Sequence, residues 1–222
     1  MERPLYLYIM LSRTNTGMGK VIRLFTHSRY NHVSLTLDPQ FRSFVSFARY
    51  VQDVPLAGGF ISEPAERFLC EGKAVPVRIF RQKIAPAQFN ALSKLFSLAD
   101  RRETGLIYNS LGALLSTWHI HCAIPGCYTC LDFASAIVGQ AFSSLQELEE
   151  CLSPSVYYEG DLRSLVSDTG DRSAPYFGKR GFFRGCKDTV IHFVRLLGRI
   201  FRISKCSDPI AEYQKENAGL PV

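Results

Sequence analysis

The chain contains 222 residues with a formal net charge of +6; 46% of its residues are hydrophobic and 21% are charged. This length can bury a core without disulfides or a structural metal, and the composition excludes a disordered, collagen-like or disulfide-scaffold chain. No apolar run reaches the roughly 18 residues of a membrane span, and the apolar stretch 5–11 is too short for a secretion signal. We therefore expect a cytoplasmic protein, and seven irregularly spaced cysteines fit a reducing compartment.

The positive charge is concentrated near the C-terminus. Eight basic residues and one acidic residue lie between Lys179 and Lys205, so this segment carries +7. The remaining 18 basic and 19 acidic residues leave the rest of the chain at −1. A neutral body argues against a nucleic-acid-binding surface, and we expect no nucleic-acid partner. We divide the chain into a domain over 1–170 and a basic extension over 171–222.

The first half of the chain shows patterns typical of strands. Residues 5–11 predict a buried strand, and 31–37 and 41–47 predict a hairpin around the turn at Asp38-Pro39-Gln40. We expect a helix over 20–27, a short helix over 64–71 and a strand over 74–84 with Pro76 near its start. The Gly58-Gly59 pair is expected to interrupt regular structure.

The second half is mainly helical. Helices are expected over 86–102, 108–118 and 131–142, and the last of these begins just after Thr129-Cys130. A capping-box pattern at Ser144 predicts another short helix, residues 152–188 are mostly loop, and a last helix covers 189–203. Strands and helices are segregated along the chain rather than alternating, which predicts an α+β fold.

Cys130 is the first candidate catalytic residue. It follows an irregular loop and opens an apolar helix, where unpaired backbone N–H groups and the positive end of the helix dipole favour a thiolate. The thiolate is the nucleophilic form of cysteine, so this position suits a cysteine enzyme. The alternative is a core cysteine, because free cysteine is commonly buried.

His32 is the candidate base. On its alternating strand it lies opposite the core-facing Val33 and Leu35. Histidine titrates near neutral pH and takes a proton from a thiol within hydrogen-bonding distance. The alternative is a strand histidine at the surface with no catalytic role.

Together the two positions resemble a known family. The segments Tyr30-Asn31-His32-Val33-Ser34-Leu35 and Tyr128-Thr129-Cys130-Leu131-Asp132-Phe133-Ala134, with the histidine first, are similar to the circularly permuted papain-like cysteine hydrolases of the NlpC type. Their branches include amidase-like and lecithin:retinol acyltransferase-like proteins, and Gly58-Gly59-Phe60-Ile61-Ser62-Glu63 also resembles permuted members. The resemblance covers about residues 5–165 and implies a permuted papain-like fold, with a small antiparallel sheet or barrel packed against helices.

The resemblance also implies a mechanism. Cys130 attacks an acyl carbon, His32 takes and returns the proton, and a thioester intermediate forms. The backbone N–H of Cys130 is one expected oxyanion donor. Tyr128 is similar to a tyrosine that precedes the cysteine in this superfamily, and it is a candidate second donor, with an ordinary boundary tyrosine as the alternative.

A third polar group normally orients the histidine. If the hairpin turn is centred on Pro39, His32 faces Ser46 across the sheet. A serine accepts a hydrogen bond but does not stabilise an imidazolium as a carboxylate does. Glu63, in the segment that resembles the permuted branch, is the nearest carboxylate, and the sequence leaves the choice between Ser46 and Glu63 open.

A zinc site is a competing interpretation of the cysteine region. Two residues of the set form a Cys-x-x-Cys, and all of its members lie within twelve residues: His119, His121, Cys122, Cys127 and Cys130. There is no second paired motif at standard spacing, and the helix after Cys130 looks like core. We therefore expect no metal and no other cofactor, and keep a zinc-stabilised protein as an alternative.

Three functions follow from these patterns. The first is a thiol hydrolase, a peptidase or amidase, that cleaves a small peptide or amide. The second is a lipid acyl hydrolase or acyltransferase that uses the same Cys-His pair. The third is a non-enzymatic binding protein, either zinc-stabilised or a degraded homologue.

The C-terminal helix has a wide apolar surface. Its polar positions recur at helical spacing and form one stripe: Asp188, His192, Arg195, Arg199 and Arg202. In one interpretation the helix packs into a groove or against a second copy and only this stripe meets solvent. In the other, residues 179–205 lie on an anionic membrane or an acidic partner, which would make the protein peripheral at a membrane.

Overall fold

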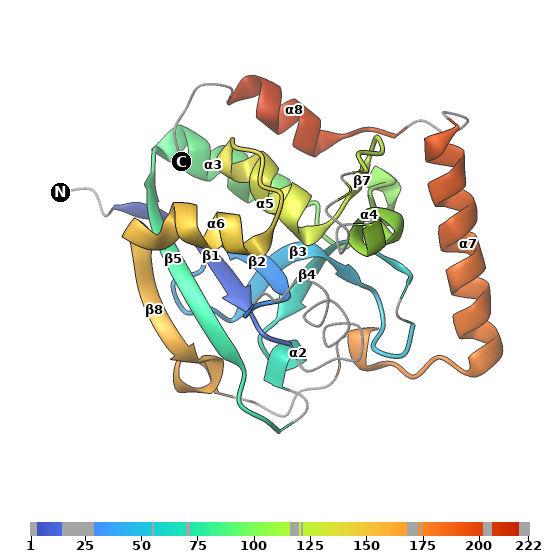
Figure 1. The fold of residues 1–222 in the computed structure, drawn as a ribbon, viewed down its shortest axis with the longest axis horizontal. Helices are drawn as coiled ribbons and strands as arrows, with labels where there is room; N and C mark the ends of the chain where they lie inside the picture. Colours follow the sequence, from blue (N-terminus) through green and yellow to red (C-terminus); the bar gives the residue numbers. More distant parts are fainter. Residues whose placement is uncertain are drawn as a thin grey trace.

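The computed structural model describes residues 4–14, 29–54, 56–69, 72–115, 120, 122–167, 173, 175–201 and 206–217. Within these residues the fold is α+β, as the sequence predicts, with helices packed against a curled eight-stranded sheet (Figure 1). The strands are β1 Leu5–Ser12, β2 His32–Thr36, β3 Ser43–Arg49, β4 Gly58–Pro64, β5 Pro76–Ile84, β6 Ile107–Tyr108, β7 Cys127–Tyr128 and β8 Val156–Asp161. The helix expected over 20–27 lies outside the described residues.

The helices of the described residues are mostly short. They are α2 Glu66–Leu69, α3 Pro86–Phe96, α4 Ser110–Leu115, α5 Cys130–Val138, α6 Leu145–Leu152, α7 Phe182–Ile200 and α8 Pro209–Glu216. Single 3₁₀ turns are formed by η1 Arg102–Thr104, η3 Ser153–Ser155, η4 Leu162–Ser164 and η5 Pro175–Phe177. Among these residues no helix combines the length and the apolar character that crossing a bilayer requires.

The strand order in the sheet is β7-β6-β4-β3-β2-β1-β5-β8. Neighbouring strands are antiparallel except for β6 and β7, which are parallel. The strands β1 to β4 follow one another in the order β4-β3-β2-β1, so their pairing needs only hairpin-like connections. The arrangement puts β2 and β4 on either side of β3, and these two strands carry His32 and Glu63.

Both faces of the sheet are covered. In β1, Leu7, Ile9 and Leu11 face a large core that also contains residues of α3, α5, α6 and α8, and Figure 1 shows α3, α5 and α6 gathered over one side of the sheet. Tyr8 and Met10 face a second core on the other side, built with residues from β3, β5 and α2. Polar residues of β2 that point away from the large core are therefore buried as well, Ser34 among them.

The β2–β3 hairpin forms as expected, but with a different register. Leu35 pairs with Val45, so the turn is centred on Gln40 rather than on Pro39. The turn includes Phe41 in the left-handed region, with φ of 56°. This shift moves Ser46 away from the position opposite His32.

Several boundaries differ from the sequence-based expectations. Gly58-Gly59 begins β4 instead of interrupting it. Glycine allows the close pairing with β3 at this point, because a Cβ atom at Gly58 would collide with the backbone of Ala48 on that strand. Helix α3 ends at Phe96, before the expected end at residue 102 and well before Gly105. The chain turns after the helix: Asp100 has a φ of 66°, and its N–H donates to the carbonyl of Phe60. Residues 156–161 form the edge strand β8, and 107–108 form β6 in place of a helix start.

The C-terminal residues belong to the same packed body as the rest of the chain. Helix α8, which the sequence patterns did not predict, is capped by Asp208 and inserts Ile210 and Tyr213 into the large core. Helix α7 begins at Phe182 rather than at residue 189, and its Leu196 packs in a small cluster with Ile107. The expected division at residue 170 therefore does not separate two independently packed units.

The packing of α8 predicts that the C-terminal end stabilises the whole domain. Ile210→Ala removes a side chain that is fully buried in the large core, and such changes cost about 2–5 kcal/mol. Urea unfolding followed by circular dichroism measures this loss. The solvent-exposed Val190→Ala is the control and should change the unfolding free energy by less than about 0.5 kcal/mol; equal effects of the two variants would contradict the assignment.

Candidate active site

Cys130 is the first residue of α5, as the sequence predicts. A capping box fixes this helix start: the Thr129 hydroxyl accepts from the Asp132 N–H at 3.1 Å, and the Asp132 carboxylate accepts from the Thr129 N–H at 2.8 Å. The apolar face of α5 places Phe133, Ala134 and Ile137 in the large core. The helix is therefore anchored on one side, while Cys130 stays partly exposed at its first position.

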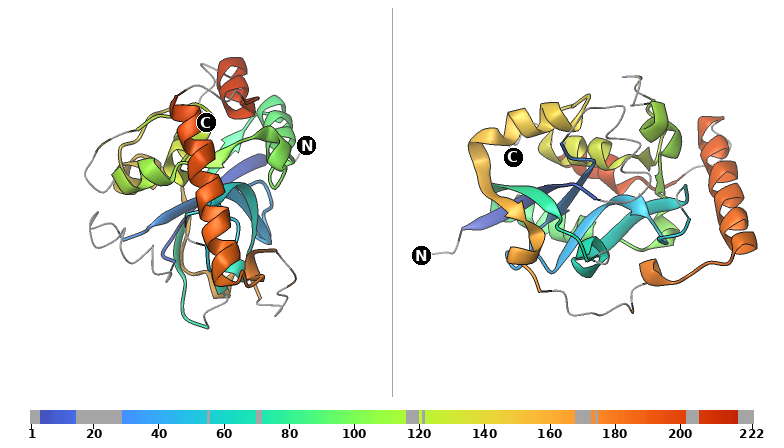
Figure 2. Two further views of the ribbon diagram at one scale, coloured as in Figure 1. Left: turned by 90° about the vertical axis from the view of Figure 1, so that its right-hand side faces the viewer. Right: turned by 60° about the horizontal axis from the view of Figure 1, so that its bottom comes forward.

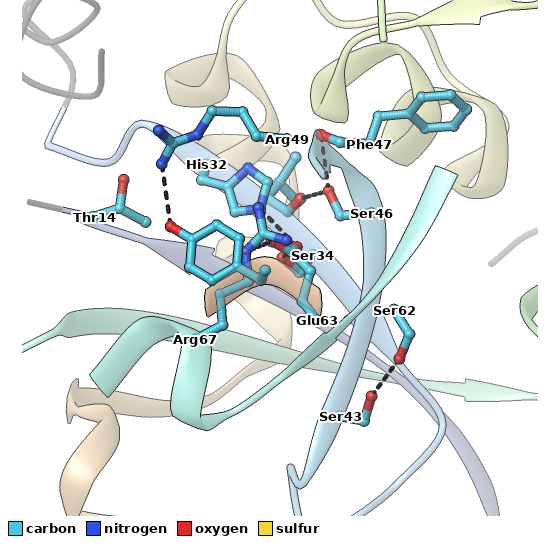
Figure 3. Close-up of polar contacts among 12 residues, drawn as sticks. Thr14, His32, Ser34, Ser43, Ser46, Phe47, Arg49, Ser62, Glu63 and Arg67 are labelled. Carbon is cyan, nitrogen blue, oxygen red and sulfur yellow. Dashed lines mark hydrogen bonds and ion pairs between the residues drawn. The ribbon is translucent and has the colours of Figure 1, made fainter. Parts of the chain in front are cut away.

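His32 is the first residue of β2, and its ring lies between two functional groups. Its Nε2 atom is 2.8 Å from Oε2 of Glu63, a residue of β4 (Figure 3). Cys130 lies close enough to the His32 ring to help raise the pKa of the imidazole. The His32 side chain, which is 13% exposed, thus lies near both the Cys130 thiol and the Glu63 carboxylate.

Glu63 is held by more than His32. The Ser34 hydroxyl donates to Oε2 at 2.8 Å, and Arg67 Nε lies 3.1 Å from Oε1 (Figure 3). The Arg67 guanidinium lies 4.0 Å over the ring of Tyr176, a residue of the C-terminal part of the chain. A carboxylate with only 1% exposure requires such partners, because an unpaired buried charge is costly.

Burial and charge act in opposite directions on the His32–Glu63 pair. Burial disfavours the imidazolium, but the charge of Glu63 and the hydrogen bonds of Cys130 and Glu63 outweigh it and raise the pKa of His32 to about 10. Burial likewise disfavours the carboxylate, but the charges of His32 and Arg67 outweigh it and lower the pKa of Glu63 to about 2. At neutral pH the pair is an imidazolium bound to a carboxylate.

Ser46 does not take the orienting role that the assumed hairpin register suggested. Its buried hydroxyl donates to the carbonyl of Val33 at 2.9 Å, so it tethers β3 to β2 (Figure 3). Of the two residues between which the sequence left the choice open, Glu63 is the one that contacts His32.

Tyr128 is also placed differently from its expected role as an oxyanion donor. Its hydroxyl donates to Oδ2 of Asp208 at 2.8 Å and so ties β7 to the start of α8. A second tyrosine, Tyr108, is buried near enough to Cys130 to interact with it electrostatically: burial, and then the charge of Cys130, raise the pKa of its phenol. The Tyr108 Cβ would lie 3.0 Å from a Cβ at Gly58, so a glycine on β4 lets β6 approach.

The other cysteine of the Cys-x-x-Cys motif, Cys127, lies in an apolar cluster away from His32. Cys127 packs with Ile107, Ile124 and Leu196, and burial raises the pKa of its thiol to about 12. Within the part of the chain that the structure describes, no group of three or more His, Cys, Asp or Glu side chains is arranged so that it could hold a metal ion. His119 and His121, which the zinc hypothesis also requires, lie outside that part.

Four contributing residues escaped the sequence analysis. Ser34 had a signal, because it lies two positions from His32 on the same face of a strand. Arg67 lies four positions after Glu63, a spacing at which ion pairs are common in helices. Tyr108 and Tyr176 had no local signal, since each reaches the site through long-range packing.

Comparison of the chain with protein-family models, with curated proteins and with solved structures found no match. The chemistry of the site is therefore argued from its own geometry. A thiol at a helix start, an imidazolium on it and a buried carboxylate behind the imidazolium are the parts of a nucleophile–base–orienter triad.

The carboxylate should control the protonation of His32. In Glu63→Gln the charge that raises the His32 pKa is gone while the burial remains, so we expect the pKa to fall from about 10 to 6.5 or below. NMR titration of the imidazole resonances measures this directly. Glu159→Gln is the matched control, since Glu159 pairs with Arg29 and Arg78; an unchanged His32 pKa in Glu63→Gln would contradict the pairing.

The same variant has a second readout in stability. The raised pKa of His32 stabilises the fold fully below pH 6.5, and this contribution is lost as pH rises through about 10. The lowered pKa of Glu63 stabilises the fold above pH 4.5, and this contribution is lost as pH falls through about 2. The difference in unfolding free energy between the wild type and Glu63→Gln should thus be largest between pH 4.5 and 6.5.

Proposed function

We propose that the protein is a cysteine hydrolase that cleaves an amide bond in a small peptide or amide through a thioester intermediate. The observation that carries the proposal is the position of the His32 ring, which bonds to the buried Glu63 carboxylate and lies close enough to Cys130 for the thiol to act on its pKa. A core cysteine or a surface histidine would not need a buried carboxylate beside it. The resemblance to permuted papain-like hydrolases of the NlpC type supports the same assignment.

Glu63 holds the His32 ring for proton transfer. Its carboxylate is paired with two cations, His32 and Arg67. The paired imidazolium lies near Cys130, and a cysteine nucleophile requires a histidine that exchanges protons with it.

The catalytic cycle then uses the His32 proton twice. The Cys130 sulfur attacks the carbonyl carbon, and the carbonyl oxygen becomes negative in the tetrahedral intermediate. His32 holds the proton as the sulfur attacks, and its imidazolium gives this proton to the leaving amine as the C–N bond breaks. In deacylation His32 takes a proton from water, and the hydroxide attacks the thioester carbon. The C–S bond then breaks, the acid leaves, and the proton taken from water stays with the Cys130–His32 pair for the next cycle.

Two groups are suited to stabilise the oxyanion. The N–H of Cys130 is in the first turn of α5, where N–H groups have no intrahelical partner. We assign the second donor to the hydroxyl of Tyr108, whose phenol is close enough to Cys130 for the sulfur charge to act on it. Tyr128 is excluded from this role because its hydroxyl is bonded to Asp208.

A lipid acyl hydrolase or acyltransferase is the second candidate. It is favoured by α7, whose apolar residues are largely exposed and could contact a lipid substrate. The same Cys-His pair serves both reactions, and the acceptor of the acyl group distinguishes them.

The assignment within the Cys-x-x-Cys motif is tested with p-nitrophenyl acetate as an acyl donor. Cys130→Ala should abolish the burst of nitrophenolate and the acetylated peptide seen by mass spectrometry, because the nucleophile is gone. Cys127→Ala should retain both, because Cys127 is a buried thiol with a pKa of about 12. If Cys127→Ala is instead the inactive variant, the nucleophile has been assigned wrongly.

The role of Tyr108 is tested by comparing two reactions of the same thiol. Tyr108→Phe should slow acetylation of Cys130 by p-nitrophenyl acetate about tenfold or more, because the tetrahedral intermediate loses a donor. It should leave the alkylation of Cys130 by iodoacetamide unchanged, since alkylation forms no oxyanion. Tyr128→Phe is the control and should preserve both rates; an equal loss of both rates in Tyr108→Phe would indicate a structural role.

A further inference from the structure

Helix α7 is attached to the body of the protein along one side only. It stands at the edge of the molecule in Figure 1 and runs across the front in the left view of Figure 2. With 19 residues it is about 28 Å long at a rise of about 1.5 Å per residue. An ordinary amphipathic surface helix packs its apolar side against the protein and exposes its polar side, whereas α7 does the reverse.

The side of α7 that faces the body is partly polar. His192 is buried with its Nε2 atom 3.5 Å from the Ser110 hydroxyl, and Arg199 donates to the carbonyl of Gly105 at 3.1 Å. Leu196 completes this side. The interpretation in which the polar stripe meets solvent and the apolar surface is packed away is therefore wrong, because His192 and Arg199 satisfy buried backbone and hydroxyl groups.

The opposite side of α7 is apolar and exposed. One stripe follows the i, i+7, i+11, i+14, i+18 spacing of a single helix face: Phe183, Val190, Val194, Leu197 and Phe201. Phe183 is 86% exposed and Val194 62% exposed, and Phe182, Ile191, Phe193 and Ile200 widen the stripe. Monomeric proteins rarely expose so continuous an apolar surface unless it has a partner.

Basic side chains border this stripe. Arg184, Lys187 and Arg195 are exposed on α7, and Lys179 is exposed just before it. The one acidic residue of the helix, Asp188, lies 3.8 Å from the Arg180 side chain. One edge of the stripe, called its basic border below, is thus positively charged along the helix.

We propose that α7 is a membrane-docking helix, which lies in the interface of an anionic bilayer with its Phe183–Phe201 stripe among the acyl chains and its basic border on the lipid phosphates. Aromatic and branched apolar residues on one side, with Lys and Arg beside them, are the signature of interfacial helices. The charge of the border selects a surface rich in anionic lipid.

The charge pattern also argues against an antiparallel second copy as the occupant. In an antiparallel pair of α7 helices packed through their stripes, the basic edges of both copies would lie side by side, and like charges would repel. The helix also lacks the length and apolar character to cross a bilayer. An interfacial position satisfies both constraints, and it does not depend on the proposed chemistry of Cys130.

Vesicle flotation of the full-length protein tests the proposal. Vesicles that contain phosphatidylserine should carry the protein, and the bound fraction should fall at high salt because the basic border is screened. Vesicles of phosphatidylcholine alone should bind about tenfold less protein or weaker still. Light scattering of the protein without lipid shows whether it self-associates.

Two pairs of variants separate the apolar stripe from the basic border. Val190→Glu with Val194→Glu places charges in the stripe at exposed positions, and Arg184→Glu with Lys187→Glu reverses the border; each should weaken binding about tenfold or more. Val156→Glu, on the exposed edge strand β8, is the control for the first pair. Lys73→Glu with Lys94→Glu, two exposed lysines outside α7, matches the net charge of the second.

The outcomes are distinct. Selective loss in the α7 variants, with unchanged circular dichroism and melting, supports the docking helix, and it does so equally in a Cys130→Ala background. Binding that is equal on neutral vesicles, or equally weakened by the control variants, overturns the proposal. A stable dimer that ignores vesicles and dissociates in Val190→Glu/Val194→Glu would show instead that a second copy covers the stripe.

Discussion

The buried carboxylate of Glu63 is the group on which the rest of the site depends. A carboxylate with 1% exposure is stable only if its charge is matched, and here a histidine and a serine of β2 and an arginine of α2 converge on it. Removing one partner would leave an uncompensated buried charge, which is far more costly than the loss of a surface ion pair. The carboxylate thus fixes the start of β2, the end of β4 and the position of α2 together, and it orients the His32 ring.

The position of Cys130 is fixed by a separate set of interactions at the start of α5. The capping box of Thr129 and Asp132 determines where α5 begins, and the core-facing residues of the helix determine where it lies against β2 and β3. Cys130 lies near His32 because Glu63 fixes the start of β2 and α5 packs against β2 in the same sheet. Small changes in the packing of α5 would therefore change the position of the Cys130 thiol, which itself packs against the large core.

The residues after 170 connect this site with the outer surface of the protein. Tyr176 lies against Arg67, which pairs with Glu63, and His192 of α7 lies against the backbone of Tyr108. Helix α8 reaches into the large core. A segment that looks like a basic appendage by composition is therefore part of the domain on its inner side, and its outer side alone is free to meet a partner such as a lipid surface.

The sequence by itself determined the elements whose signals are local: the alternation of β1 and β2, the start of α5 at Cys130, and the order of histidine before cysteine. It also pointed to Cys130 and His32 as candidates, because their positions at a helix start and a strand are local features. Tertiary structure alone decided which of Ser46 and Glu63 contacts His32, since a shift of the turn by one position changed which residue lies opposite His32. It also showed that the Tyr128 hydroxyl is bonded to Asp208, and it reversed the expected sides of α7. In each case the periodicity of the sequence shows which residues share one face of a strand or helix. What packs against that face depends on residues far away in the sequence, and no local pattern contains this information.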